Sequence, residues 1–402
     1  MRPASWRLLA AFAIAAELSA AEPNWKRLLQ NADWFGLRAA ASSAAPPEYY
    51  RAVLAATFDR EDDALPRLLK LTASPRDRVA AHETLLSLHL RHGRYRSALR
   101  EIEALLALKP NRRDLRNARD LFGPMAALGD LEVAQSGPPS PLSWRTIDGN
   151  LFIPVTVNGQ PGEYLLDTGA NLGVMSAGEA RRLGMDPGAS HSHGKDISGR
   201  NVALQSVAAA EVRIGGLVFR NVGFGVVPDD KMPFNELKEG QRGVIGLPLI
   251  LAAGVWRWAA DGPLEAGAAP GGCPAEGNLA FSGSMPLVRT EVQGAPMVFR
   301  LDTGAQSTHL WAPFVKRFPL PAGSRRKVTV TGVGGESRFP GGHMPEVELR
   351  LGGGTVKLKD VQAVLRAAES DYGLYAGNLG LDMLGSLRRL ILDFRGMCVT
   401  AE

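Results

Sequence analysis

Cysteine is scarce in this chain of 402 residues, which contains two, Cys273 and Cys398. No Cys-X-X-Cys pair occurs, which disfavours a structural zinc site and a thioredoxin-like redox site. His191 and His193 offer two metal ligands without a convincing third. We therefore expect no metal and no other cofactor. An exported protein can join its two thiols, but the sequence does not show whether these two lie close enough.

A strong excess of charge is also missing, since 46 basic residues face 41 acidic ones, for a formal net charge of +5. No run of Lys and Arg interleaved with aromatic residues occurs, so nucleic-acid binding is not expected. Beyond the N-terminus the chain has no apolar run of bilayer-spanning length. We expect no stable membrane insertion.

The N-terminus has the pattern of a secretory signal. Arg2 and Arg7 precede an apolar stretch from Leu8 to Ala16, and Ser19-Ala20-Ala21 supplies small residues for cleavage. Residues 1–21 are therefore predicted to be a signal peptide, and the protein to be secreted or periplasmic. The alternative is the start of a buried helix.

Residues 22–135 show apolar residues at helical spacing and two similar units, which begin 34 residues apart at Ala64 and Ala98. Helical pairs with this period resemble the tetratricopeptide repeat, whose small, aromatic and terminating positions are matched by Gly93, Tyr95, Ala98 and Pro110. Such helices bind a protein partner in a groove or serve only as a packed cap.

Two segments rich in proline and glycine, residues 136–143 and 261–277, are predicted to be linkers. The first linker predicts that the helical region folds independently of the rest. Between and after the linkers, short alternating apolar runs and many glycines predict two β lobes, residues 144–260 and 278–402.

The two lobes repeat one another. Each has an apolar strand that runs into Asp-Thr-Gly-Ala, at Asp167 and at Asp302, with a turn glycine eight residues earlier. Each has a later Gly-X-apolar-Gly-Leu segment, at residues 243–247 and 377–381. Duplication of a plain β unit explains matched strands, but it does not explain why the same acid recurs in both copies.

These motifs resemble those of the pepsin and retropepsin clan of aspartic proteases. The resemblance implies a mainly β, bilobal fold, with two retropepsin-like lobes in one chain after the helical region. It implies a catalytic pair, Asp167 and Asp302, and loop-supporting roles for the residues that follow each aspartate: Thr168, Gly169, Ala170, Thr303, Gly304 and Ala305. The threonine hydroxyls are expected to cross-link the two loops.

Retropepsin-like folds also cover the cleft with a glycine-rich hairpin. Gly332, Gly334 and Gly335 fit such a flap in the second lobe, and residues 196–200 are a poorer match in the first. The alternative is an ordinary hairpin turn, because glycines serve any tight turn.

Two adjacent carboxyls that share one proton provide both a base for water and an acid for the leaving group. We therefore predict an aspartic endopeptidase whose substrate is a peptide or protein. The main alternative is a catalytically silent peptide-binding or scaffolding protein that keeps the fold. A glycosidase is a third reading, because paired acids also cleave glycosides.

Overall fold

A computed structural model describes residues 23–188, 192–195, 201–332, 335–365 and 374–402. The predicted signal peptide lies outside these residues. The chain divides into two compact units, residues 1–46 and 47–402. In the first unit, helices α1 (Trp25–Gln30) and α2 (Trp34–Ser43) begin after Asn24 and Asp33, whose side chains accept hydrogen bonds from backbone N–H groups of the first turn.

Five helices open the second unit: α3 (Glu48–Thr57), α4 (Glu61–Leu71), α5 (Arg78–Arg91), α6 (Tyr95–Leu108) and α7 (Arg113–Leu128). The helical prediction for this region is confirmed up to Leu128. Ala64 in α4 and Ala98 in α6, the two residues that begin the similar units, are both fully buried. In the described part of the chain, no helix is long and apolar enough to span a bilayer.

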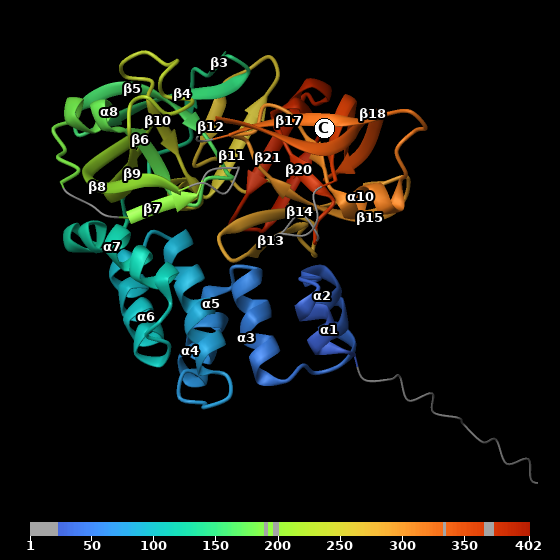
Figure 1. Ribbon diagram of the computed structural model, residues 1–402, viewed down its shortest axis with the longest axis horizontal. Coiled ribbons are helices and arrows are strands. Elements are labelled where there is room, and N and C mark those ends of the chain that lie inside the picture. The colour runs from blue at the N-terminus through green and yellow to red at the C-terminus, as the bar shows by residue number, and fades with distance from the viewer. Residues whose placement is uncertain (1–22, 189–191, 196–200, 333–334, 366–373) are drawn as a thin grey trace, which may run out of the picture. The chain divides into compact units, whose positions relative to one another are not determined.

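The first β lobe is built on a sheet with the strand order β1-β9-β6-β10-β5-β4-β8-β7, with β3 paired to β4 (Figure 1). Its strands are β1 (Glu132–Gln135), β3 (Arg145–Ile147), β4 (Asn150–Val157), β5 (Gln160–Leu166), β6 (Gly173–Ser176), β7 (Ser192–Lys195), β8 (Asn201–Ile214), β9 (Leu217–Val227) and β10 (Gly243–Ile245). Helices α8 (Ala177–Arg182) and α9 (Leu247–Ala253) follow β6 and β10.

The second lobe has the order β13-β14-β15-β20-β16-β19-β18-β17. Its elements are β13 (Leu279–Ser282), β14 (Met285–Val292), β15 (Ala295–Leu301), β16 (His309–Leu310), α10 (Ala312–Arg317), β17 (Arg325–Gly332), β18 (Gly335–Leu351), β19 (Gly354–Val364), β20 (Gly377–Leu379) and the 3-10 helix η2 (Leu381–Ser386).

Both lobes use the same local plan around their aspartate. A hairpin turn with two left-handed residues, Asn158-Gly159 or Gln293-Gly294, leads into the strand that ends at the aspartate. That strand pairs in parallel with a short strand from the later glycine motif, β5 with β10 and β15 with β20. The predicted duplication is therefore a duplication of structure.

A third sheet takes strands from both lobes, in the order β2-β12-β11-β21-β22. Its strands are β2 (Ser140–Leu142), β12 (Leu264–Ala266), β11 (Val255–Ala259), β21 (Arg389–Asp393) and β22 (Cys398–Ala401). The two segments predicted to be linkers thus contribute β2 and β12. Their pairing with distant strands outweighs their poor local strand propensity.

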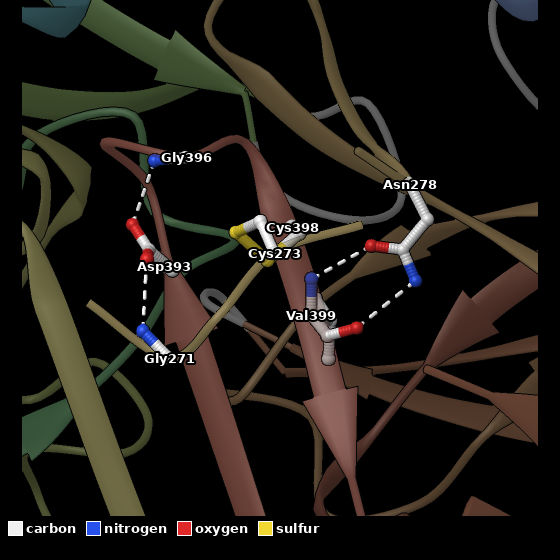
Figure 2. The surroundings of a disulfide bond; sticks show 7 residues. All are labelled: Gly271, Cys273, Asn278, Asp393, Gly396, Cys398 and Val399. Carbon is white, nitrogen blue, oxygen red and sulfur yellow. Dashed lines mark hydrogen bonds between the residues drawn. A yellow bond between two sulfur atoms is a disulfide. The ribbon is translucent and has the colours of Figure 1, made fainter. Parts of the chain in front are cut away.

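A disulfide fastens the second of these segments to the end of the chain. Cys273 and Cys398 are bonded, with 5.7 Å between their Cα atoms. Beside them, the Asp393 carboxylate accepts hydrogen bonds from the N–H groups of Gly271 (3.2 Å) and Gly396 (2.7 Å) (Figure 2). The side chain of Asn278 bonds both the N–H and the carbonyl of Val399, at 2.7 and 3.1 Å. The connection between the lobes is therefore well anchored.

The helices from α3 onward belong to the same compact unit as the lobes. Strand β1, which follows α7, joins the sheet of the first lobe through β9. Gly223 of β9 lies so close to Tyr95 and Met125 that a Cβ there would clash with both side chains. The structure thus differs from the prediction of an independently folding helical region, because the lobe sheet and the helices share packed surface.

Arg91, at the end of α5, connects the helices to the second lobe. Its guanidinium is buried, pairs with Asp59 at 2.7 Å, donates to the carbonyl of Gly283 at 3.1 Å and lies 4.6 Å from the ring centre of Phe281. Burial would raise the pKa of Asp59, but Arg91 and His92 lower it to about 2. The favourable interaction with Arg91 and His92 therefore outweighs the cost of burying the Asp59 carboxylate.

Replacing Arg91 by Met should destabilise the protein by about 3–5 kcal/mol, because it leaves the Asp59 carboxylate buried without its main partner. The free energy of unfolding in urea measures the loss. Arg389→Met is the matched control, because Arg389 pairs with an exposed Glu402 and should contribute less than about 1 kcal/mol. Equal losses in the two variants would contradict the anchoring role of Arg91.

The same pair predicts a pH dependence. A carboxyl whose pKa is lowered in the folded state stabilises the fold above its unfolded pKa of about 3.9. This contribution is lost as the pH falls toward about 2. The stability difference between wild type and Arg91→Met should therefore shrink over that interval. A difference that stays constant down to pH 2 would contradict this assignment, because most of the stabilisation from an ionised Asp59 is lost by that pH.

Candidate active site

Asp167 and Asp302 each follow a buried strand at the same position in their lobe. The N–H of Asp167 donates to the carbonyl of Ile245 at 3.0 Å, and the N–H of Asp302 donates to that of Leu379, also at 3.0 Å. Three residues after each aspartate, the carbonyls of Ala170 and Ala305 each accept a backbone hydrogen bond of 2.8 Å, which closes the loop. Strands β10 and β20 thus hold the two aspartates in equivalent positions.

The structure brings the two carboxyl groups together. Each Oδ1 accepts hydrogen bonds from the N–H groups two and three residues later, 2.7 and 3.1 Å for Asp167 and 3.1 Å twice for Asp302. A Cβ on Gly169 would lie 2.6 Å from Cγ of Asp302, and a Cβ on Gly304 would clash with the carboxylate of Asp167. Each glycine therefore lets the carboxyl of the other lobe approach, and the carboxyls are close enough to hydrogen-bond.

Burial and the neighbouring charge of Asp302 raise the pKa of Asp167, while the N–H groups of Gly169 and Ala170 oppose the rise. Two carboxyls in contact cannot both ionise readily, so the pair retains one proton at a pH where isolated aspartates have lost theirs. The arrangement provides an acid and a base within one site.

Thr168 and Thr303 lock the two loops to one another. The hydroxyl of Thr168 accepts from the N–H of Thr303 at 3.0 Å and donates to the carbonyl of Leu301 at 2.9 Å. The hydroxyl of Thr303 accepts from the N–H of Thr168 at 3.0 Å and donates to the carbonyl of Leu166 at 2.7 Å. The structure thus contains the cross-links that the family resemblance implied, and both threonines are buried.

The loops rest on an apolar floor built by both lobes and the third sheet. A cavity of about 30 Å³ lies there beside Thr303. Its other lining residues are apolar: Leu151, Leu166, Trp256, Trp258, Leu264, Leu381, Met383, Leu384, Leu390 and Leu392. An apolar cavity of this size has too few polar partners for a water molecule, so the threonine bonds are shielded from competing solvent.

One polar residue at the site was missed by the sequence reasoning. Nδ2 of Asn378, in β20, donates a 2.8 Å hydrogen bond to Oδ2 of Asp302. The position follows the first glycine of the repeated Gly-X-apolar-Gly motif, where the first lobe has Val244. An amide in an otherwise apolar strand was the signal that could have found it.

His309 interacts electrostatically with both Asp302 and Asp382. Burial lowers the pKa of His309, against the nearby carboxylates of Asp382 and Asp302. Asp382 accepts hydrogen bonds from the N–H and hydroxyl of Thr308 at 2.8 and 2.7 Å, while burial raises its pKa. These bonds hold the loop that follows Ala305.

The flap predictions are described only in part. Strands β17 and β18 form a hairpin in which Gly332 pairs with Gly335, while Gly334 lies outside the described residues. In the first lobe, β7 and β8 form a hairpin with Lys195 paired to Asn201, and residues 196–200 lie outside the described residues. A covering role for either hairpin stays a prediction.

Two family models match the two β lobes. Residues 153–249 match a family model described as aspartyl protease, and residues 288–386 match one described as gag-polyprotein aspartyl protease. The chain carries two aspartyl protease domains in tandem. Each matched segment contains one of the two aspartates and the later glycine motif.

The solved structures that match include a retropepsin-like aspartic protease from Rickettsia conorii. It is 20% identical to this chain, covers 34% of it and 90% of its own length, and has a TM-score of 0.23. The two domains are assigned from the family models and not from this likeness. A comparison with curated proteins found no match.

Replacing Thr168 by Val should destabilise the fold, because it orphans the buried N–H of Thr303 and the carbonyl of Leu301. The expected loss is about 1–3 kcal/mol for each orphaned group. Thr168→Ser keeps the hydroxyl and is the control, and thermal unfolding compares the two variants. A Thr168→Val protein as stable as Thr168→Ser would show that the cross-links do not hold the lobes together.

Proposed function

We propose that this protein is an aspartic endopeptidase that hydrolyses peptide bonds with a water activated by Asp167 and Asp302. The observation that carries the proposal is the contact between two carboxyls from different lobes, each held by backbone N–H groups and backed by the glycine of the other lobe. The matches to aspartyl protease families support the general class.

The proposed chemistry needs one proton on the pair. The ionised carboxylate removes a proton from a water molecule as the water oxygen bonds to the carbonyl carbon of the substrate. The protonated carboxyl donates a hydrogen bond to the carbonyl oxygen as negative charge develops there. A proton then passes to the amide nitrogen, the C–N bond breaks, and a carboxylic acid and an amine leave.

Physical features of the site favour turnover over the alternative of a silent binding scaffold. A scaffold has no need of two carboxyls in contact, because their mutual repulsion and desolvation are unfavourable. Both carboxyls are present here, and burial together with the charge of Asp302 raises the pKa of Asp167. Titratable groups whose pKa values are perturbed in this way cluster at sites of chemistry.

We propose that the protein acts outside the cytoplasm, as a secreted or periplasmic enzyme. The N-terminal signal pattern motivates this, and the disulfide between Cys273 and Cys398 supports it, because such bonds persist in oxidising compartments. A role for the tetratricopeptide-like helices in holding a protein partner is part of the same proposal. Signal cleavage is checked by sequencing the N-terminus of the exported protein.

Asp167→Asn and Asp302→Asn should each lower kcat on a denatured protein substrate by at least about 10³-fold, and the double variant should lose little more. The residues act as one unit, so their effects are not additive. Casein cleavage across acidic to neutral pH is the measurement. Asn in place of Asp keeps the shape of the loop, and unfolding curves check that each variant folds.

Substantial activity in either single variant would reject the shared-carboxyl mechanism. Wild-type protein that binds peptides but cleaves none between acidic and neutral pH would favour the scaffold alternative. A bell-shaped pH dependence is expected for the wild type. Activity falls at low pH, where both carboxyls are protonated, and at high pH, where the shared proton is lost.

A further inference from the structure

The hydrogen bonds to the two carboxyls are nearly symmetric, with one exception. The backbone N–H groups of each loop bond Oδ1 of their own aspartate in the same way. Oδ2 of Asp302 has an additional donor, the amide of Asn378. The counterpart of Asn378 in the first lobe is Val244, whose side chain has no hydrogen-bonding group.

Strand register establishes that these two positions correspond. Val244 lies opposite Leu165 in β5, two residues before Asp167, and Asn378 lies opposite Arg300 in β15, two residues before Asp302. Across the other neighbouring strand, Val244 pairs with Val174 and Asn378 pairs with His309. The strand beside Asp167 thus has valines at these positions, whereas the strand beside Asp302 has polar residues there.

Asn378 is also poorly satisfied for a buried residue. Its side chain is buried, and its Oδ1 has no hydrogen-bond partner in the described structure. A buried acceptor without a partner destabilises the folded state, because its desolvation is not compensated. Val, as in the first lobe, would avoid that cost, so folding stability alone does not explain an amide here.

We propose that Asn378 is a positioning residue, whose hydrogen bond to Asp302 places the shared proton on Asp167. An amide N–H donor stabilises a carboxylate more than it stabilises a neutral carboxyl. Asp302 is therefore the ionised member that activates water, and Asp167 is the acid that faces the substrate carbonyl. The roles of base and acid rest on the proposed peptidase function. The location of the proton follows from the hydrogen bond of Asn378 and does not depend on that function.

The charged and titratable neighbours of Asp302 do not oppose this assignment. Burial and the charge of Asp302 raise the pKa of Asp167, which is the direction that this assignment requires. His309, on β16, interacts electrostatically with Asp302, and burial lowers its pKa. Asp382, on η2, is occupied by hydrogen bonds from Thr308. On β15, the guanidinium of Arg300 lies over the ring of Trp311, 5.9 Å from its centre.

Titration without substrate tests the proposal directly. The full-length protein is labelled with 13C at the aspartate carboxyls, and Asp167→Asn and Asp302→Asn identify the two signals. In the wild type, Asp302 should ionise first and Asp167 should keep the proton. In Asn378→Val, the first ionisation of the pair should move up by about one to two pH units, because the charged form of Asp302 loses a hydrogen bond that favours it over the neutral form.

A donor swap provides the matched control. In Asn378→Val with Val244→Asn, the donor faces the other carboxyl, so Asp167 should now ionise first. The shift caused by Asn378→Val should persist in a His309→Val background, because it comes from the amide bond and not from the imidazole. Asn378→Val repeats the valine of the first lobe and is expected to fold, which its unfolding curve checks.

Kinetics separate this inference from the proposed function. If the protein cleaves peptides, the acidic limb of kcat/KM in Asn378→Val should move to higher pH by the same amount as the titration. A uniform loss of activity with an unmoved limb would mean that Asn378 only supports the fold. If no peptide is cleaved, the titration alone decides. An unchanged first ionisation in Asn378→Val, or a wild type in which Asp167 ionises first, would overturn the proposal.

Discussion

The contact between the carboxyls of Asp167 and Asp302 is the constraint on which the rest of the structure depends. Two acids in contact, partly removed from water, resist the approach of their lobes, because burial and mutual repulsion both disfavour their charged forms. The protein offsets this locally with backbone donors on each Oδ1 and with one retained proton. It also needs a scaffold that holds the lobes together against the repulsion between the two carboxyls.

That scaffold is built in two layers. Next to the carboxyls, Thr168 and Thr303 exchange hydrogen bonds across the two loops above an apolar floor. Further out, the third sheet pairs β11 of the first lobe with β21 of the second, from Val255 opposite Asp393 to Ala259 opposite Arg389. The disulfide of Cys273 ties the connecting segment to the last strand. A rigid support of this kind keeps catalytic groups within the small tolerances that chemistry requires.

The sequence predicted the site well where it repeats itself. Duplicated Asp-Thr-Gly-Ala motifs, turn glycines and partner loops located the two carboxyls, because these motifs are local in the sequence. The threonine cross-links join residues about 135 positions apart and were expected from the family resemblance. The sequence failed for β2 and β12, which lie in segments rich in glycine and proline and are made into strands by distant partners. It also missed Asn378, whose role depends on which side chain of β20 meets Asp302, a contact across 76 residues.

The central claim is that one chain forms one site from both lobes, and ligand binding tests this most directly. A peptide in which a secondary alcohol replaces the scissile amide mimics the tetrahedral intermediate, and calorimetry counts its binding to the full-length protein. The account predicts one ligand per chain, with affinity at least about 10²-fold weaker in both Asp167→Asn and Asp302→Asn, since such mimics bind through groups that act in the transition state. Binding that is unchanged in either variant, or half a ligand per chain, would contradict it.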